Sequence, residues 1–169
     1  MKTKDPKPRL GLDFGKVIMG AVINGKADTS FLGTSFEDAM KSPATEGAVE
    51  AVAELVDRFE GEVWIVSKCG PSVENKTKGW LKHHDFYGQT GLQRKNLRFC
   101  RKRPDKAPIC KQLRITHFVD DRADVLQHMI GVVPNLFLFG EQCDHVDKGP
   151  FIPANTWESV LDLIPAQKT

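Results

Sequence analysis

Short apolar segments alternate with helix patterns along this chain, and this alternation limits its possible folds more than any other feature. Apolar runs typical of strands cover residues 9–14, 62–67, 96–100, 115–119 and 136–139. Helix patterns cover residues 45–61, 72–84, 105–113, 125–130 and 157–164. We expect Thr45 and Ser72 to cap the helices that follow them, and Gly61 to end the first of these. Strands that alternate with helices predict an α/β fold with a central, mostly parallel sheet covered on both faces.

The length and composition are those of one globular domain. The chain has 169 residues, of which 40% are hydrophobic and 27% are charged, so we expect a single domain over residues 1–169. No apolar run approaches the roughly 18 residues that cross a bilayer, and no export signal follows the basic start of the chain. We therefore expect a cytoplasmic protein without a membrane partner.

The segment between the first strand and the first helix is too short for a second domain. An apolar stretch over residues 17–23 precedes Asn24-Gly25, a strong turn signal. The stretch is a hairpin arm or a continuation of the strand, and residues 26–43 have the composition of a loop. We therefore expect residues 15–35 to form a hairpin flap.

The four cysteines, Cys69, Cys100, Cys110 and Cys143, have no C-x-x-C spacing. Without a secretory signal, they are expected to be reduced thiols. A metal site of Cys143 with the adjacent Asp144 and His145 is an alternative, although zinc usually needs four ligands and no second cluster is evident.

Three predicted strands end on polar residues, namely Asp13, Ser67 and the pair Asp120-Asp121. In parallel sheets ligands bind outside the carboxyl ends of the strands, so these side chains should face one crevice. Carboxylates there would suit Mg²⁺, which prefers oxygen ligands, and a hydroxyl and an ammonium group would bind a phosphoryl group. The alternative is structural, with Asp13 as a turn residue and Asp120-Asp121 as a helix cap.

Four short segments, in this order and at these strand ends, resemble the four motifs of the haloacid dehalogenase-like (HAD-like) hydrolase superfamily. The segments are Leu12-Asp13-Phe14-Gly15-Lys16-Val17, Ile65-Val66-Ser67, Lys106 and Phe118-Val119-Asp120-Asp121. The resemblance covers roughly residues 9–140 and implies a three-layer Rossmann-like domain. No insertion of cap size interrupts it, so the chain resembles the capless members, whose open sites take large substrates or are closed by a partner subunit.

The resemblance also implies which residues attack phosphorus and which hold magnesium. Asp13 would be the nucleophile and a ligand of Mg²⁺. Asp120, supported by Asp121, would hold the metal, and so would the backbone carbonyl group of Gly15.

Three further residues would bind the phosphoryl group. Ser67 and Lys68 would contact its oxygens, while Lys106 would steady both the nucleophile and the transferred group. Lys111 is the rival for this lysine role. We favour Lys106, because it lies at the start of the helix that leads into the strand of Asp120, where the resemblance places this lysine.

One position departs from the pattern of the family's phosphatases. They carry a second aspartate, the general acid and base, two residues after the nucleophile, where this chain has Gly15. General acid–base catalysis is typically worth about 10²–10⁴ in rate. We therefore expect a Mg²⁺-dependent phosphohydrolase with weakened activity on ordinary phosphomonoesters, using an activated substrate or an acid from Lys16 or a partner. The alternative is a non-catalytic relative that binds metal and a phosphorylated small molecule or macromolecule.

A basic stretch, Arg94–Arg103, contains six cationic side chains, those of Arg94, Lys95, Arg98, Arg101, Lys102 and Arg103. Such a stretch is usually a solvated surface, but it can also bind nucleic acid through counterion release. If Arg101–Arg103 lie beside the strand ends, they could instead steer a phosphorylated ligand into the pocket. His117 is expected to point away from that crevice.

Overall fold

The computed structural model describes residues 6–20, 31, 35–140 and 149–166, and within them all strands of the sheet run in one direction. The sheet has six strands in the order β3-β2-β1-β4-β5-β6, and each pairs in parallel with its neighbour. The strands are β1 (Leu10–Leu12), β2 (Val63–Lys68), β3 (Leu97–Cys100), β4 (His117–Asp120), β5 (Asn135–Phe139) and β6 (Ile152–Ala154). This confirms the predicted α/β class with a Rossmann-like, three-layer arrangement.

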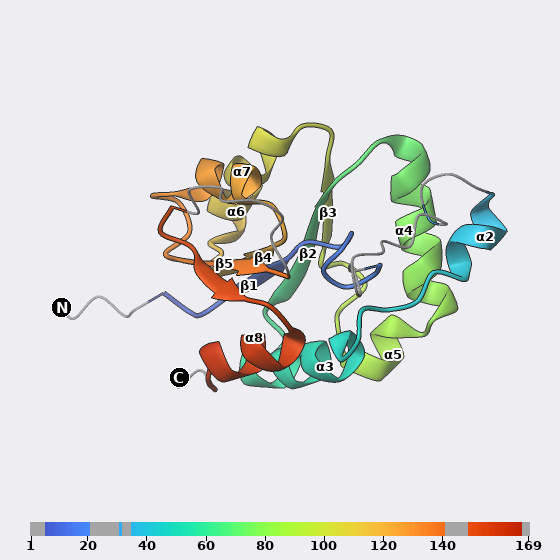
Figure 1. Cartoon of the computed structure of the whole chain (residues 1–169), viewed down its shortest axis with the longest axis horizontal. Coiled ribbons are helices and arrows are strands. Elements are labelled where there is room, and N and C mark those ends of the chain that lie inside the picture. The colour runs from blue at the N-terminus through green and yellow to red at the C-terminus, as the bar shows by residue number, and fades with distance from the viewer. Residues whose placement is uncertain (1–5, 21–30, 32–34, 141–148, 167–169) are drawn as a thin grey trace.

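Helices cover both faces of the sheet, as Figure 1 shows, with α6 and α7 on one side and α3 and α8 on the other. The α-helices are α2 (Phe36–Met40), α3 (Ala48–Arg58), α4 (Pro71–His83), α5 (Phe86–Thr90), α6 (Lys106–Leu113), α7 (Ala123–Leu126) and α8 (Trp157–Leu163). Two 3₁₀ turns are η1 (Arg103–Asp105) and η2 (Gln127–Met129). No helix in the described ranges is both long and apolar enough to span a membrane.

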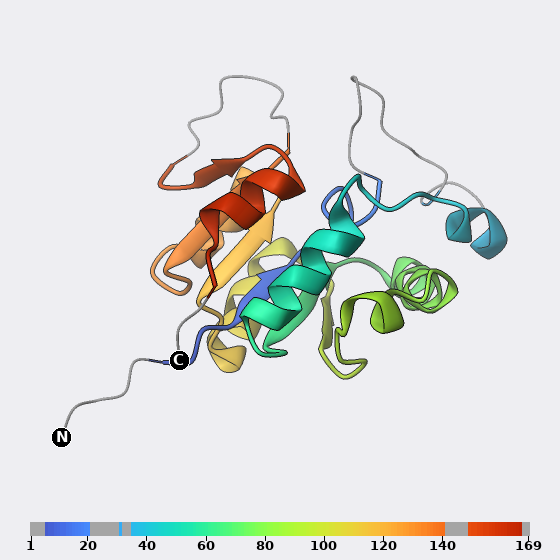
Figure 2. The ribbon, with the colours of Figure 1, turned by 90° about the horizontal axis from the view of Figure 1, so that it is seen from below.

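The two faces of the sheet bury separate apolar clusters. Leu12, on β1, belongs to the cluster under α3, α4 and α8, whereas Phe118, on β4, belongs to the cluster under α6 and α7. The turned view in Figure 2 shows α3 and α8 lying over the same face. Arg58 joins them, because its Nη1 donates to the carbonyl oxygens of Leu161 and Ile164 at 2.8 Å each.

The strand order reverses direction between β1 and β4. From β1 the chain adds β2 and β3 on one side, then returns to add β4, β5 and β6 on the other. The crossovers leave in opposite directions from this point, so a crevice opens at the carboxyl ends of β1 and β4. The N–H of Asp13 donates to the carbonyl oxygen of Val119 at 3.0 Å, which places the end of β1 beside the end of β4.

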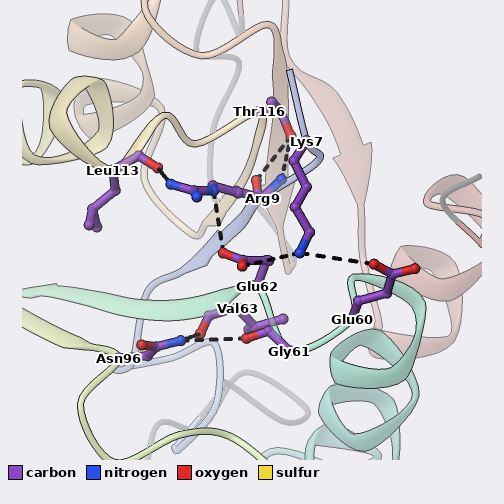
Figure 3. A network of polar contacts seen from close by, with 9 residues as sticks. All are labelled: Lys7, Arg9, Glu60, Gly61, Glu62, Val63, Asn96, Leu113 and Thr116. Atoms are coloured by element: carbon purple, nitrogen blue, oxygen red, sulfur yellow. Dashed lines mark hydrogen bonds and ion pairs between the residues drawn. The ribbon is translucent and has the colours of Figure 1, made fainter. Parts of the chain in front are cut away.

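A polar network, drawn in Figure 3, fixes the start of β1 at the amino end of the sheet. Lys7 Nζ and Arg9 Nε each lie 3.3 Å from a carboxylate oxygen of Glu62. Arg9 also donates from Nη1 to the carbonyl oxygen of Leu113 at 2.8 Å, and its backbone N–H donates to Thr116 Oγ1 at 2.9 Å. The register of β1 between its two neighbours is therefore set by side chains as well as by the ladder.

Three short elements were not predicted. α2 and α5 have five residues each, too few for a helical period to be seen. For α2 a signal existed, because Ser35 accepts a hydrogen bond from the N–H of Asp38 and so caps the helix. β6 has three residues, one of them Pro153, and proline is disfavoured in strands except at sheet edges such as this.

The predicted strand over residues 17–23 is wrong in its described part. The carbonyl oxygen of Phe14 accepts hydrogen bonds from the N–H groups of Val17, Ile18 and Met19, which closes a turn immediately after β1. The Asn24-Gly25 turn and most of the predicted 15–35 flap lie outside the described residues.

Two predicted helix caps are also wrong. α3 has Gly47 rather than Thr45 at its N-cap, with a left-handed φ of 77°. α4 has Gly70 as its N-cap instead of Ser72, followed by Pro71, whose fixed φ favours the first turn of a helix. α3 ends at Arg58 rather than at Gly61, although the N–H of Gly61 still donates to the carbonyl oxygen of Val56.

Gly11 provides a test of how tightly this sheet packs. A Cβ atom at Gly11 would lie 2.5 Å from the ring of the fully buried Phe118, whereas a Cβ at Gly15 would have no atom within 4 Å. We predict that Gly11→Ala lowers the free energy of unfolding by about 1–3 kcal/mol and that Gly15→Ala changes it by less than about 0.5 kcal/mol. Urea denaturation measures both, and equal effects would contradict this packing.

Candidate functional site

The carboxyl ends of β1, β2 and β4 converge on a cavity of about 270 Å³. Asp13 follows β1, Ser67 lies near the end of β2, and Asp120 ends β4, so the three predicted strand ends line one cavity. The parallel register accounts for this, because adjacent strands end at the same edge of the sheet.

Lys106 joins two of these strand ends. Its Nζ lies 3.0 Å from Asp13 Oδ1 and 2.8 Å from Asp120 Oδ2, and its side chain is only 2% exposed. Lys106 is the first residue of α6, which begins at the carboxyl edge of the sheet after η1. Lys111 is exposed near the other end of the same helix, so of these two candidates Lys106 is the one that lines the cavity.

A third carboxylate, that of Asp121, lies close to the two that Lys106 contacts. Asp13, Asp120 and Asp121 can each offer an oxygen so that the three atoms lie within 4.8 Å of one another. Asp13 is 9% exposed and Asp120 is fully buried, so both carboxylates are largely removed from water. The N–H of Arg122 donates to Asp120 Oδ1 at 3.0 Å, which fixes that carboxylate at the end of its strand.

Burial and neighbouring charges shift the pKa values of three groups beside Asp13, namely Asp120, Asp121 and Lys106. Burial and the neighbouring Asp13 carboxylate raise the pKa of both Asp120 and Asp121 above the usual range of an aspartate. Burial alone would lower the pKa of Lys106, but the Asp13 and Asp120 carboxylates outweigh it and raise that pKa above its ordinary value. The ammonium group is therefore retained at neutral pH.

The donor set fits a magnesium ion. Three carboxylates and one ammonium group carry a formal charge of −2 when all are ionised, and all three candidate ligands offer oxygen atoms. Mg²⁺ is a hard cation that binds through a small number of carboxylates and retains water. Binding of a divalent cation would offset the repulsion that raises the pKa of Asp120 and Asp121.

The remaining predicted phosphate ligands also line the cavity. Ser67 is buried and Lys68, the last residue of β2, is exposed. Gly15 lies on the cavity wall, where it presents no side chain.

The turn after Asp13 is fixed by aromatic side chains from two helices. Trp157, on α8, donates from Nε1 to the carbonyl oxygen of Val17 at 2.9 Å. The ring of Phe14 packs edge-on against that of Trp80, on α4, with centroids 5.3 Å apart. Within the turn, Lys16 has a left-handed φ of 62°, which is uncommon outside glycine and is often associated with functional sites.

Two arginines line the cavity in addition to the predicted site residues, and of these Arg103 had been considered only as one of the three steering cations Arg101–Arg103. Arg103, in η1, and Arg122, directly after Asp121, both line it. Arg103 lay in the basic stretch, but nothing in the sequence distinguishes it from the other cations there. Arg122 could have been found from its position, because it follows the acidic pair at a strand end.

The basic stretch does not act as one surface. Of its six cations only Arg103 lines the cavity. Arg101 donates to the carbonyl oxygen of Cys69 at 2.7 Å and lies 3.2 Å from Glu74 Oε1, while the guanidinium group of Arg94 lies over the ring of Tyr87. The stretch is therefore divided between structural contacts and the cavity.

His117 lies away from the cavity, as predicted. Its ring packs against Phe59 and Phe137, and its Nδ1 lies 2.8 Å from Thr116 Oγ1. Burial lowers the pKa of His117 to about 4, so the ring is neutral at physiological pH.

The described cysteines are free thiols, in line with the prediction. Cys69, Cys100 and Cys110 are all buried, and burial raises the pKa of each above its ordinary value. The alternative metal site at Cys143, Asp144 and His145 lies outside the described residues.

Comparison with known proteins does not assign this chain to a family. No protein-family model matches the chain, and a search of the curated proteins finds no match either. The likeness to HAD-like hydrolases therefore rests on the four sequence motifs.

The role of Lys106 as the cation between the two buried carboxylates can be tested by replacing it, with Lys111 on the same helix as a control. Lys106→Met leaves two buried carboxylates without their cation, so we predict a loss of about 3–5 kcal/mol in the free energy of unfolding of metal-free protein. The loss should be greater at pH 8 than at pH 5, because protonation removes the uncompensated charge at low pH. Urea denaturation in a chelator measures it. Lys111→Met is the control, and a similar loss there would contradict the assignment.

Proposed function

We propose that this chain is a HAD-like, Mg²⁺-dependent phosphohydrolase in which Asp13 is the nucleophile. The observation that carries the proposal is the contact of Lys106 with both Asp13 and Asp120 beside a cavity, with a third carboxylate, Asp121, adjacent. A structural ion pair would need neither the third carboxylate nor a cavity beside it. Perturbed carboxylates grouped in a cleft are typical of functional sites.

In the proposed reaction a carboxylate oxygen of Asp13 attacks the phosphorus atom of the substrate. A bond forms between that oxygen and phosphorus, and the bond between phosphorus and the leaving oxygen breaks, which gives an aspartyl phosphate on the protein. Water then attacks this phosphorus atom, releases inorganic phosphate and restores the carboxylate.

Lys106 would serve both steps as a fixed positive charge. Its contact with Asp13 Oδ1 holds the carboxylate in one orientation, and its burial keeps the charge close to the oxygens of the transferred group. Preorganised charges of this kind stabilise the transition state without reorganising during the reaction. Ser67 and Lys68, at the end of β2, would bind the remaining phosphoryl oxygens.

Asp13, Asp120 and Asp121 would hold the metal ion, together with the backbone carbonyl group of Gly15. A bound Mg²⁺ would neutralise charge on the phosphoryl oxygens. The backbone contact of Arg122 with Asp120 would then orient one of its ligands.

Departure of the leaving group is the step that this cavity supports least. Gly15 stands where the resemblance places a general acid, so an alkoxide would leave without a proton. Aryl phosphates and acyl phosphates have leaving groups stable enough to depart as anions, and these are the substrates that we expect to turn over.

Gly15 also favours one second candidate, a non-catalytic protein of the same fold. Such a protein would bind Mg²⁺ and a phosphorylated ligand through the same side chains, but it would not hydrolyse the phosphate ester. A partner subunit that covers the cavity is compatible with either candidate.

An activity panel distinguishes these two candidates. Purified protein with Mg²⁺ should hydrolyse an aryl phosphate and an acyl phosphate, and Asp13→Asn should reduce both rates to those without protein, because an amide cannot act as this nucleophile. Chelation should abolish turnover and Mg²⁺ should restore it. The control is Asp57→Asn, the same chemical change on the exposed surface of α3. If folded protein that binds Mg²⁺ turns over neither ester, the non-catalytic candidate replaces this one.

Restoring a carboxyl group at position 15 is a second test. A Cβ there would meet no atom within 4 Å, so a side chain can begin at this position without a clash. We predict that Gly15→Asp raises kcat for an alkyl phosphomonoester by about 10²-fold or more, because it supplies the missing proton. Gly15→Asn has the same size without that proton and should give no such gain. Equal rates for the two variants would show that the acid is not what limits the reaction.

A further inference from the structure

We propose that Arg103 and Arg122 form a second phosphate subsite at this cavity, so that the substrate carries two phosphate groups. The inference rests on the proposed function, because it assigns the first group to Asp13 and Lys106. The second group would be a phosphomonoester or phosphodiester on the same molecule.

The two arginines come from different segments and meet at one carboxylate. Arg122 Nε and Nη2 lie 3.0 and 2.9 Å from the two carboxylate oxygens of Asp124, and Arg103 Nη1 lies 3.7 Å from Oδ2 of the same side chain. Arg122 Nη1 makes no hydrogen bond to any residue within the described ranges. Two guanidinium groups therefore share one carboxylate, and donors remain on both.

Both arginines are exposed and also line the cavity. Asp124 does not line it, so the carboxylate holds the two guanidinium groups from outside. Guanidinium groups offer several N–H donors in a planar fork that matches the oxygens of a phosphate. The arrangement therefore presents paired donors to a ligand in the cavity.

The charge of the cavity exceeds what one phosphoryl group can balance. Among the described residues its lining holds five cationic side chains and three carboxylates, a formal surplus of two positive charges. Including Asp124 reduces the surplus to one, and a bound Mg²⁺ raises it to three. A phosphomonoester dianion offsets two of these three charges, which leaves one positive charge for a second anionic group.

The positions of the charges separate two subsites. Lys106 is buried with Asp13 and Asp120, whereas Arg103 and Arg122 are exposed and joined through Asp124. A volume of about 270 Å³ exceeds that of a single water molecule, about 30 Å³, several times over. A ligand can therefore extend from the buried carboxylates to the exposed arginines.

A binding experiment tests this independently of turnover. In an Asp13→Asn background with Mg²⁺, calorimetry would compare a nucleoside 5′-monophosphate with the corresponding 3′,5′-bisphosphate and with a 5′-phosphorylated dinucleotide. We expect the two-phosphate ligands to bind at least about tenfold more tightly than the monophosphate, as hydrogen bonds to charged groups allow. Tighter binding of the 3′,5′-bisphosphate would indicate a small bisphosphate as the ligand, and tighter binding of the dinucleotide would indicate a nucleic-acid end.

The arginines are then removed in the same background. Arg103→Ala and Arg122→Ala should each reduce the preference for two phosphates, and the double variant should abolish it together with the steeper salt dependence of the two-phosphate ligand. Arg103→Lys, which keeps the charge and loses the fork, should retain part of the preference. The control is Lys111→Ala, which removes an exposed cation from the far end of α6.

Two results would overturn the subsite. One is equal affinity of the parent protein for the monophosphate and both two-phosphate ligands. The other is an equal loss of affinity for all three ligands when the arginines are removed, as expected from a general electrostatic effect. Neither result depends on hydrolysis, so failure of the subsite is distinguishable from failure of the proposed phosphohydrolase, which the aryl and acyl phosphates test.

Discussion

Lys106 places one ammonium group between the carboxylates of Asp13 and Asp120, at 3.0 and 2.8 Å, and the geometry of the cavity depends on this contact. Without a cation, two buried carboxylates at neighbouring strand ends would repel each other or take up protons. With it, one positive charge in contact with both carboxylates offsets part of this repulsion. The same charge that stabilises the fold is thus held where a transferred group would bind.

The sheet topology accounts for why these three residues meet. Asp13 follows β1 and Asp120 ends the adjacent strand β4, at the reversal of strand order, and Lys106 begins the helix that returns the chain from β3 to β4. The side chains at the centre of the cavity therefore lie at, or within one residue of, the end of a strand or the start of a helix. A few short polar segments can form a site in this way without a dedicated loop or a second domain.

Much of this arrangement could be predicted from the sequence, because strand ends are visible as polar residues after apolar runs. Asp13, Ser67 and Asp120 were predicted in this way. Lys106 was favoured over Lys111 because the resemblance to HAD-like hydrolases places a lysine at the start of this helix. Contacts between distant segments leave no such pattern.

The arginines of the cavity illustrate what the sequence could not provide. The link between Arg103 and Asp124 depends on how η1 and α7 pack, which no local spacing encodes. The short elements α2, α5 and β6 were missed for a related reason, because tertiary contacts and caps determine segments of three to five residues.

The two outer strands of the sheet have a consequence for how this protein behaves at high concentration. A parallel sheet ends in unpaired backbone groups that can recruit a strand from another molecule. Just before β3, the carbonyl oxygen of Asn96 accepts a hydrogen bond from the N–H of Ile65 on β2. The next carbonyl oxygen, that of Leu97, accepts a hydrogen bond from Arg98 Nη1 at 2.8 Å. On β6, Pro153 has no N–H to offer. Both borders of the sheet therefore resist edge-to-edge aggregation, one through a charged side chain and the other through an imino acid.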